Sequence, residues 1–195
     1  SMTALPIVET QGGDVSAYIP TNVISITDGQ IFLESSLFFA GQRPAVNVGL
    51  SVSRVGGDAQ TEAMKRASGT LRLDLAQYRE IEVFTQFSSD LDEATRLQLR
   101  YGHGLMLLLR QKQGCPIPRH RQVFTLVVAL RRVMQDVEPE EIPAFTEELL
   151  TYLEHAAPEI AEHIRQEGKL SPEDKARIEA LSDQFLSDRK ARREG

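Results

Sequence analysis

The hydrophobic pattern of the chain changes near residue 60. Before that point, short apolar and β-branched stretches lie between turn residues, which is typical of strands and loops. Residues 23–27 alternate apolar and polar side chains, and the Asp28-Gly29 pair predicts a turn into a second strand at residues 30–33. Residues 45–52 form a third apolar stretch of strand length. The first third therefore predicts three short strands with no helix between them.

After residue 60, apolar residues recur at helical spacing. Asp58 is a suitable N-cap for the start of this region, and Gly69 interrupts it. Six helices are predicted, at residues 71–84, 91–109, 119–134 and 142–153, then from Pro158 and from Pro172. Ser171 caps the last of these and Pro172 takes its first position. The basic stretch at residues 189–193 is expected to fray.

These patterns predict a mostly α fold, with a C-terminal helical bundle at residues 61–195 after a short strand-and-loop segment at residues 1–60. Three short strands make a poor independent sheet. The chain also opens without a turn or a cap. We therefore expect residues 1–60 to be the end of a larger domain, and the chain to be a fragment.

Composition narrows the functional classes. The 195 residues include 28 acidic and 22 basic side chains, so the net charge of −6 argues against a general nucleic-acid binder. The single cysteine, Cys115, excludes an internal disulfide and a zinc cage built from several cysteines. No apolar run approaches the length of a membrane-spanning helix, and no signal peptide is visible.

The histidines and the acidic residues offer two candidate sites. His155, Glu159 and His163 would share one face of a continuous helix, as in some metal sites, but Pro158 divides the segment. We interpret them as solvated surface residues, and we extend that interpretation to His103 and His120.

Residues 136–162 carry nine carboxylates and no Lys or Arg. A solvated face is the favoured interpretation of this acidic block, and a site for a basic partner is the alternative.

Arg54 is one of only two basic residues before Lys65. It follows an apolar strand at a Gly-Gly turn, where α/β domains place groups that face ligands. A planar guanidinium there suits anion recognition. A surface arginine with no role is the alternative, and spacing alone favours neither. The chain contains no phosphate-binding glycine loop.

Three sequence strings carry a family resemblance. Residues 13–31, GDVSAYIPTNVISITDGQI, closely resemble the α-subunit of the F-type proton-translocating ATP synthase. Residues 44–53, PAVNVGLSVS, resemble a signature that the α- and β-subunits share, and the following RVGG is similar to its α form. LAQYRE at residues 75–80 resembles the family's first C-terminal helix. The resemblance is collinear to about Pro116, weakens through residues 131–139, and returns near residue 168.

The resemblance implies that residues 1–60 are the last part of a nucleotide-binding domain and residues 61–195 the C-terminal helical domain. The family's phosphate loop and magnesium-binding strand would lie upstream of Ser1. In the family, the arginine that matches Arg54 acts in trans as an arginine finger in the β-subunit's catalytic site. Such a group typically contributes about 10³ to 10⁵ in rate.

Two further sets of positions follow from the resemblance. The residues that match the surroundings of the base and ribose of a non-catalytic nucleotide are Phe38, Arg43, Pro44, Gln111 and Gln113. The residues that match the turn facing the rotating central stalk are Ser88, Ser89, Asp90, Leu91, Asp92 and Glu93. The family's Arg-Gly-Tyr segment reads Arg131-Arg132-Val133 here, so no role is carried onto it.

The resemblance thus implies a non-catalytic, regulatory α-subunit that supports ATP synthesis coupled to proton transport, with the β-subunit and the central stalk as partners. ATP or ADP with Mg is expected in the full subunit. The isolated chain is expected to be inactive, to hold no cofactor and to be a monomer or dimer. Membrane association would come only through the complex, on the cytoplasmic side of the plasma membrane if the source is bacterial.

Two alternatives stay open. One is a β-subunit fragment, against which the Ile19-Pro20-Thr21-Asn22 stretch and the lack of a strongly acidic helix-turn-helix loop both speak. The other is a stand-alone helical interaction module that uses the acidic block.

Overall fold

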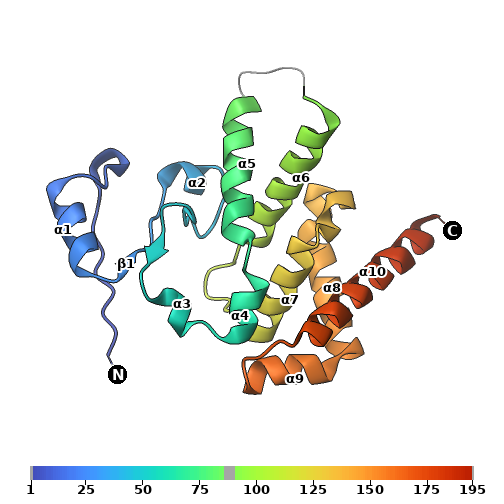
Figure 1. The fold of residues 1–195 in the computed structure, drawn as a ribbon. Helices are drawn as coiled ribbons and strands as arrows, with labels where there is room; N and C mark the ends of the chain where they lie inside the picture. Colours follow the sequence, from blue (N-terminus) through green and yellow to red (C-terminus); the bar gives the residue numbers. More distant parts are fainter. Residues whose placement is uncertain (1, 86–90, 195) are drawn as a thin grey trace. The chain divides into compact units, whose positions relative to one another are not determined.

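The computed structural model describes residues 2–85 and 91–194, and the chain divides into two compact units, Ser1–Ala59 and Gln60–Gly195 (Figure 1). The first unit is small and rich in loops. Its elements are η1 (Gln11–Gly13), α1 (Tyr18–Ile26), β1 (Gly29–Gln30), α2 (Ser35–Phe39), β2 (Val52–Ser53) and α3 (Gly56–Ala59). β1 and β2 are antiparallel, with Gly29 opposite Ser53, and a single bridge joins Leu33 to Val46.

The strand predicted at residues 23–27 is wrong, because these residues continue α1 or end it. Pro20 is tolerated because it lies in the first turn, where a backbone N–H has no helical partner. The Asn22 amide donates to the Tyr18 carbonyl at 2.8 Å, and the Thr27 hydroxyl donates to the Val23 carbonyl at 2.8 Å. These local bonds outweigh the weak strand preference of the β-branched residues.

The strand predicted at residues 45–52 is also mostly wrong. Only Val46, in the isolated bridge, and Val52, in β2, make strand pairs within that stretch. The loop between them is held by polar side chains instead. The Asn47 amide donates to Glu34 at 2.6 Å, and the Ser51 hydroxyl donates to the Asn47 carbonyl at 2.7 Å. Apolar composition alone did not reveal these loop contacts.

The second unit is a helical bundle, as predicted. Its helices are α4 (Glu62–Ala67), α5 (Leu71–Thr85), α6 (Glu93–Leu108), α7 (Arg119–Leu130), α8 (Ile142–Ala156), α9 (Pro158–Gln166) and α10 (Pro172–Glu194). Short 3-10 helices, η2 (Val133–Asp136) and η3 (Pro139–Glu141), join α7 to α8. The six predicted helices correspond to α5 through α10. The Ser171 hydroxyl accepts from the Asp174 N–H at 2.9 Å, which confirms the predicted cap.

The predictions at the two ends of this region need correction. Asp58 lies inside α3, and Thr61 is the residue that caps α4. The basic stretch at residues 189–193 continues α10 instead of fraying. Arg189 explains part of this order, since its guanidinium lies 4.8 Å from the centre of the Phe145 ring and 3.6 Å from Glu141.

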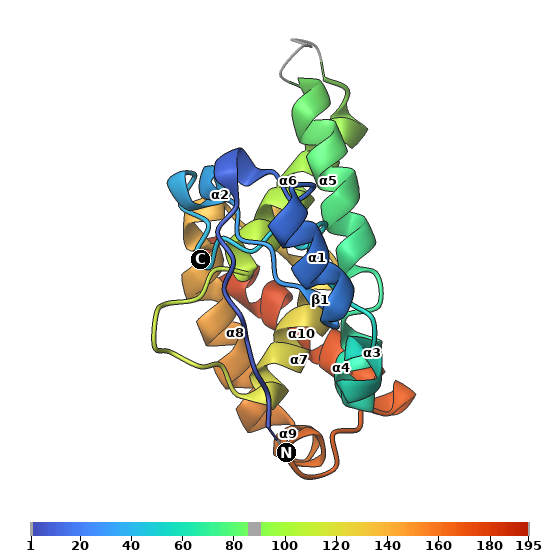
Figure 2. The same cartoon turned by 90° about the vertical axis from the view of Figure 1, so that its left-hand side faces the viewer.

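α7 is the central element of the bundle. It packs against α4, α6, α8, α9 and α10, as the two views together show (Figures 1 and 2). Its Val123 and Phe124 are fully buried, and Phe145 of α8 and Ile164 of α9 are fully buried in the same core. α5 packs along α6 and forms a hairpin with it.

A cluster of charges lies at the N-terminal turn of α7. Arg121 donates to both oxygens of Glu154 at 3.0 and 2.8 Å and to Glu147 at 3.0 Å. His120 also contacts Glu154, and it is only 3% exposed, so its interpretation as a surface residue is wrong. The sequence pattern did not reveal this burial because the partner, Glu154, lies 34 residues away along the chain.

The acidic block is largely paired within the bundle. Besides Glu147 and Glu154, three of its carboxylates lie within ion-pair distance of arginines from α9 or α10. These pairs are Arg165–Glu162, Arg177–Glu159 and Arg189–Glu141. Most of the described carboxylates of the block are nonetheless exposed, so its interpretation as a solvated face holds except at Glu141 and Glu154, which are half-buried.

Gly102 of α6 sets the closeness of the α5–α6 hairpin. A Cβ added there would overlap the ring of Tyr78 on α5, which is buried. We expect Gly102→Ala to destabilise the chain by about 1–3 kcal/mol, because overpacking outweighs the gain in helix propensity. Urea unfolding measures the change.

The matched control is Gly104→Ala in the same helix, where the added Cβ would meet Ile142 at an ordinary 3.5 Å. We expect this variant to be neutral or up to about 1 kcal/mol more stable. Equal stability of the two variants would contradict the packing argument.

Glu154 gives the bundle a pH-dependent contribution. Hydrogen bonds from Arg121, and then from His120, lower the pKa of Glu154 from 4.5 to about 2 against the opposing effect of burial. The Glu154 carboxylate therefore takes up its proton at a lower pH in the folded chain than in the unfolded chain. The resulting stability is fully present above about pH 4.5 and is lost as the pH falls toward 2.

We expect Glu154→Gln to lower the free energy of unfolding at neutral pH by about 2 kcal/mol, with solvent screening taken into account. The difference from the natural chain should shrink between about pH 5 and 2. Unfolding curves measured across this range test the expectation, and a difference that does not change with pH would refute it.

Candidate functional site

The backbone at Arg54 is anchored by Asp28. The Arg54 N–H donates to the Asp28 carbonyl at 2.9 Å and to its carboxylate at 3.1 Å, and the Val55 N–H donates to the same oxygen at 3.0 Å. The Ser53 hydroxyl donates to the other carboxylate oxygen. This Ser53 bond is the main cause that lowers the pKa of Asp28. Sequence reasoning treated Asp28 only as a turn residue and missed this role.

The Arg54 side chain lies at the C-terminal end of α1. One terminal nitrogen donates to the carbonyls of Thr27 at 2.9 Å and Ser25 at 3.3 Å, and the other donates to that of Ile24 at 3.2 Å. A cation is favoured there because helix C-termini carry partial negative charge. The residue is exposed, and within residues 2–85 and 91–194 its guanidinium has no hydrogen bond to a carboxylate.

Three of the predicted nucleotide residues lie together in the first unit. Phe38 of α2 is 47% exposed, and the Arg43 guanidinium lies 4.5 Å from the centre of its ring. The Arg43–Pro44 peptide bond is cis. An exposed aromatic face beside a cation can stack against a planar ring such as a purine.

Gln111 and Gln113 lie in the second unit, in the loop after α6, and both are exposed. The Gln111 amide donates to the Cys115 carbonyl at 2.8 Å and shapes this loop. Cys115 is itself an exposed free thiol.

The predicted stalk-facing turn is described in part. Ser88, Ser89 and Asp90 lie outside the described residues. Leu91 precedes α6, and Asp92 caps that helix by accepting from the Thr95 N–H at 2.7 Å. Glu93 opens the helix. The end of α5 nearest this turn in sequence carries two exposed apolar side chains, Val83 and Phe84.

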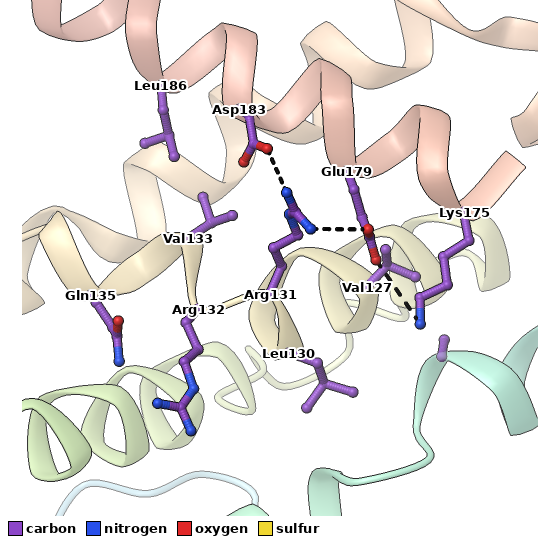
Figure 3. Close-up of a pocket in the computed structure, with 11 residues that line it drawn as sticks. Val127, Leu130, Arg131, Arg132, Val133, Gln135, Lys175, Glu179, Asp183 and Leu186 are labelled. Carbon is purple, nitrogen blue, oxygen red and sulfur yellow. Dashed lines mark hydrogen bonds and ion pairs between the residues drawn. The ribbon is translucent and has the colours of Figure 1, made fainter. Parts of the chain in front are cut away.

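A pocket of about 490 Å³ lies at the C-terminal end of α7, between that helix and α10 (Figure 3). Arg131 donates to Glu179 at 3.2 Å and to Asp183 at 2.7 Å. These bonds raise the pKa of Arg131. Lys175 lies 4.0 Å from Glu179, so the charges on this wall compensate one another.

Arg132 stands where the Arg-Gly-Tyr pattern has glycine. Its φ of 61° lies in the left-handed region that favours glycine. The guanidinium lies 4.9 Å from the centre of the Tyr101 ring, and the Tyr101 hydroxyl donates to Asp74 at 3.1 Å. Burial and Asp74 together raise the pKa of Tyr101. The cation–ring contact partly offsets the backbone strain.

The described part of the chain shows neither a metal-binding cluster nor a membrane-spanning helix. There, no three His, Cys, Asp or Glu side chains group in a way that would hold a metal ion. Within the same residues, every helix is too short or too polar to cross a membrane.

Comparison with known proteins covers both units. Residues 60–185 match the C-terminal domain of the ATP synthase alpha/beta chain. Residues 1–53 match the nucleotide-binding domain of the ATP synthase alpha/beta family. Among relatives, the ATP synthase subunit alpha of Desulforudis audaxviator (strain MP104C) is 53% identical over 185 residues, which are 95% of this chain and 36% of that protein. The chain thus spans little more than a third of the relative's length, and its two matches show that it belongs to the ATP synthase alpha/beta family.

Proposed function

We propose that the chain is the C-terminal part of an α-type, non-catalytic subunit in the catalytic head of an ATP synthase. The observation that carries the proposal is the 53% identity to a protein named ATP synthase subunit alpha. Residues 1–60 would be the end of its nucleotide-binding domain and residues 61–195 its helical domain. The subunit would support ATP synthesis coupled to proton transport and would associate with the membrane through the assembled complex.

Arg54 would supply the arginine finger to the neighbouring β-subunit. Asp28 anchors its backbone, while neutral carbonyls hold its exposed side chain. A phosphoryl group offers full negative charge and fork geometry, so it would compete well against these carbonyls. The side chain would then leave the end of α1 when the β-subunit's site is occupied.

The remaining proposed roles concern nucleotide and partners. Phe38, Arg43 and Pro44, with Gln111 and Gln113, would surround the base and ribose of an ATP or ADP bound with Mg in the full subunit. Leu91, Asp92 and Glu93 would approach the central stalk, together with Ser88, Ser89 and Asp90.

The alternative of a stand-alone module that uses the acidic block loses support from the bundle's ion pairs. Five of the nine carboxylates lie within ion-pair distance of arginines of the same unit, so less charge is left for a partner. The β-subunit alternative is weakened by the alpha-subunit relative.

Substitution of Arg54 tests the arginine-finger role. In a head reassembled from full-length subunits, Arg54→Ala should lower steady-state ATP hydrolysis by about 10³-fold or more. Arg54→Lys should also be strongly impaired, because an ammonium cannot reproduce the guanidinium fork.

Arg177→Ala is the matched control, since this exposed arginine of α10 forms an ion pair with Glu159 at 2.7 Å, away from Arg54 in the sequence. It should leave hydrolysis within about two-fold of normal. Thermal unfolding of each assembled head checks that loss of the α1 contact has not disrupted the subunit. Normal ATP hydrolysis by a folded Arg54→Ala head would contradict the arginine-finger role.

The isolated chain offers a second test. Because no phosphate-binding glycine loop is present in the sequence, we expect calorimetry to detect no micromolar, Mg-dependent ATP binding by the 195-residue chain. Binding of that strength would contradict the expectation and would imply a phosphate site within these residues.

A further inference from the structure

His120 lies at the start of α7 among charged groups from three helices. Its Nε2 atom is 2.7 Å from Glu154 of α8, whose carboxylate also receives the fork of Arg121. Arg165 of α9 spans the other side, with its Nε atom 3.2 Å from Nδ1 and a terminal nitrogen 3.0 Å from Nε2. The imidazole is thus held between an anion and a cation.

The neutral ring satisfies two of these three contacts. With its proton on Nε2 it donates to Glu154, and the lone pair on Nδ1 accepts from the Nε atom of Arg165. The terminal nitrogen of Arg165 beside Nε2 then faces a second donor and makes no hydrogen bond there. A protonated ring carries an N–H on both nitrogens, so Nδ1 can no longer accept. Two cations would then lie about 3 Å apart, one of them on an almost fully buried ring. Glu154 does not compensate both, because Arg121 already shares its charge.

Arg165 is the group that can leave. Its side chain is 49% exposed, and Glu162 on the same helix lies 3.3 Å from it as an alternative partner. His120 is 3% exposed and cannot move without opening the core, and Arg121 is held by both Glu154 and Glu147. The contact in this cluster that breaks most easily is therefore the one between His120 of α7 and Arg165 of α9.

We propose that His120 and Arg165 form a proton-dependent contact, which joins α9 to α7 while the imidazole is neutral and breaks when the imidazole is protonated. The effect is local, because Ile160 and Ile164 keep α9 in the core. It concerns the outer edge of α9 and the segment after it, where the Gly168 carbonyl accepts from the Ala63 N–H of α4 at 2.8 Å.

The test is the stability effect of Arg165→Gln, measured by urea unfolding of the full 195-residue chain at about pH 8 and about pH 5.5. In the natural background we expect this change to lower the folding equilibrium constant about five-fold at the higher pH and to have almost no effect at the lower one. In a His120→Gln background, which cannot be protonated, the effect of Arg165→Gln should be the same at both values.

Arg177→Gln is the control, because it removes an exposed ion pair to Glu159 that does not involve His120. Its effect should not change over this pH range. Hydrogen exchange of the α9 amides gives a second measurement, with protection lost on acidification in the natural chain and low at both pH values in Arg165→Gln. The proposal is overturned if Arg165→Gln has equal effects at both pH values, or if its pH dependence persists without His120.

Discussion

The second unit depends on the burial of one helix, α7. The helices α4, α6, α8, α9 and α10 all pack directly against it, and its Val123 and Phe124 have no exposed surface. Apolar contact of this kind supplies most of the free energy that holds a helical bundle together. Hydrogen bonds and ion pairs from His120 and Arg121, in the first turn of α7, to Glu154 of α8 then fix how these helices pack together.

The first unit is held by a different kind of interaction. Its described residues form one two-residue strand pair and one isolated bridge. Polar side chains supply further support, since Asp28 binds a backbone group 26 residues away and Asn47 binds a backbone group within its own loop. Many of its large apolar side chains, including Ile7, Tyr18 and Phe39, are mostly exposed. Such a surface is typical of a face that is covered by further protein. This agrees with its match to part of a nucleotide-binding domain.

Polar hydrogen bonds hold the first unit and apolar packing holds the second, and this difference determines which side chains can move. Arg54 is placed by backbone bonds to Asp28, so its main chain is fixed while its side chain has an alternative to the end of α1. The His120 cluster lies in the well-packed bundle, where only Arg165 can move at low cost. In both places an arginine with exposed surface is the movable member of an otherwise fixed set.

The sequence by itself determined the helical bundle, because stripes of apolar residues and caps such as Ser171 are local signals. It also carried the family resemblance and, through it, Arg54. Only the tertiary structure decided that His120 is buried, while the helix that includes residues 23–26 rests on local hydrogen bonds that the β-branched pattern did not reveal. Strand and helix compete closely in short β-branched segments, and a histidine's environment depends on residues such as Glu154, 34 positions away, which local spacing cannot reveal.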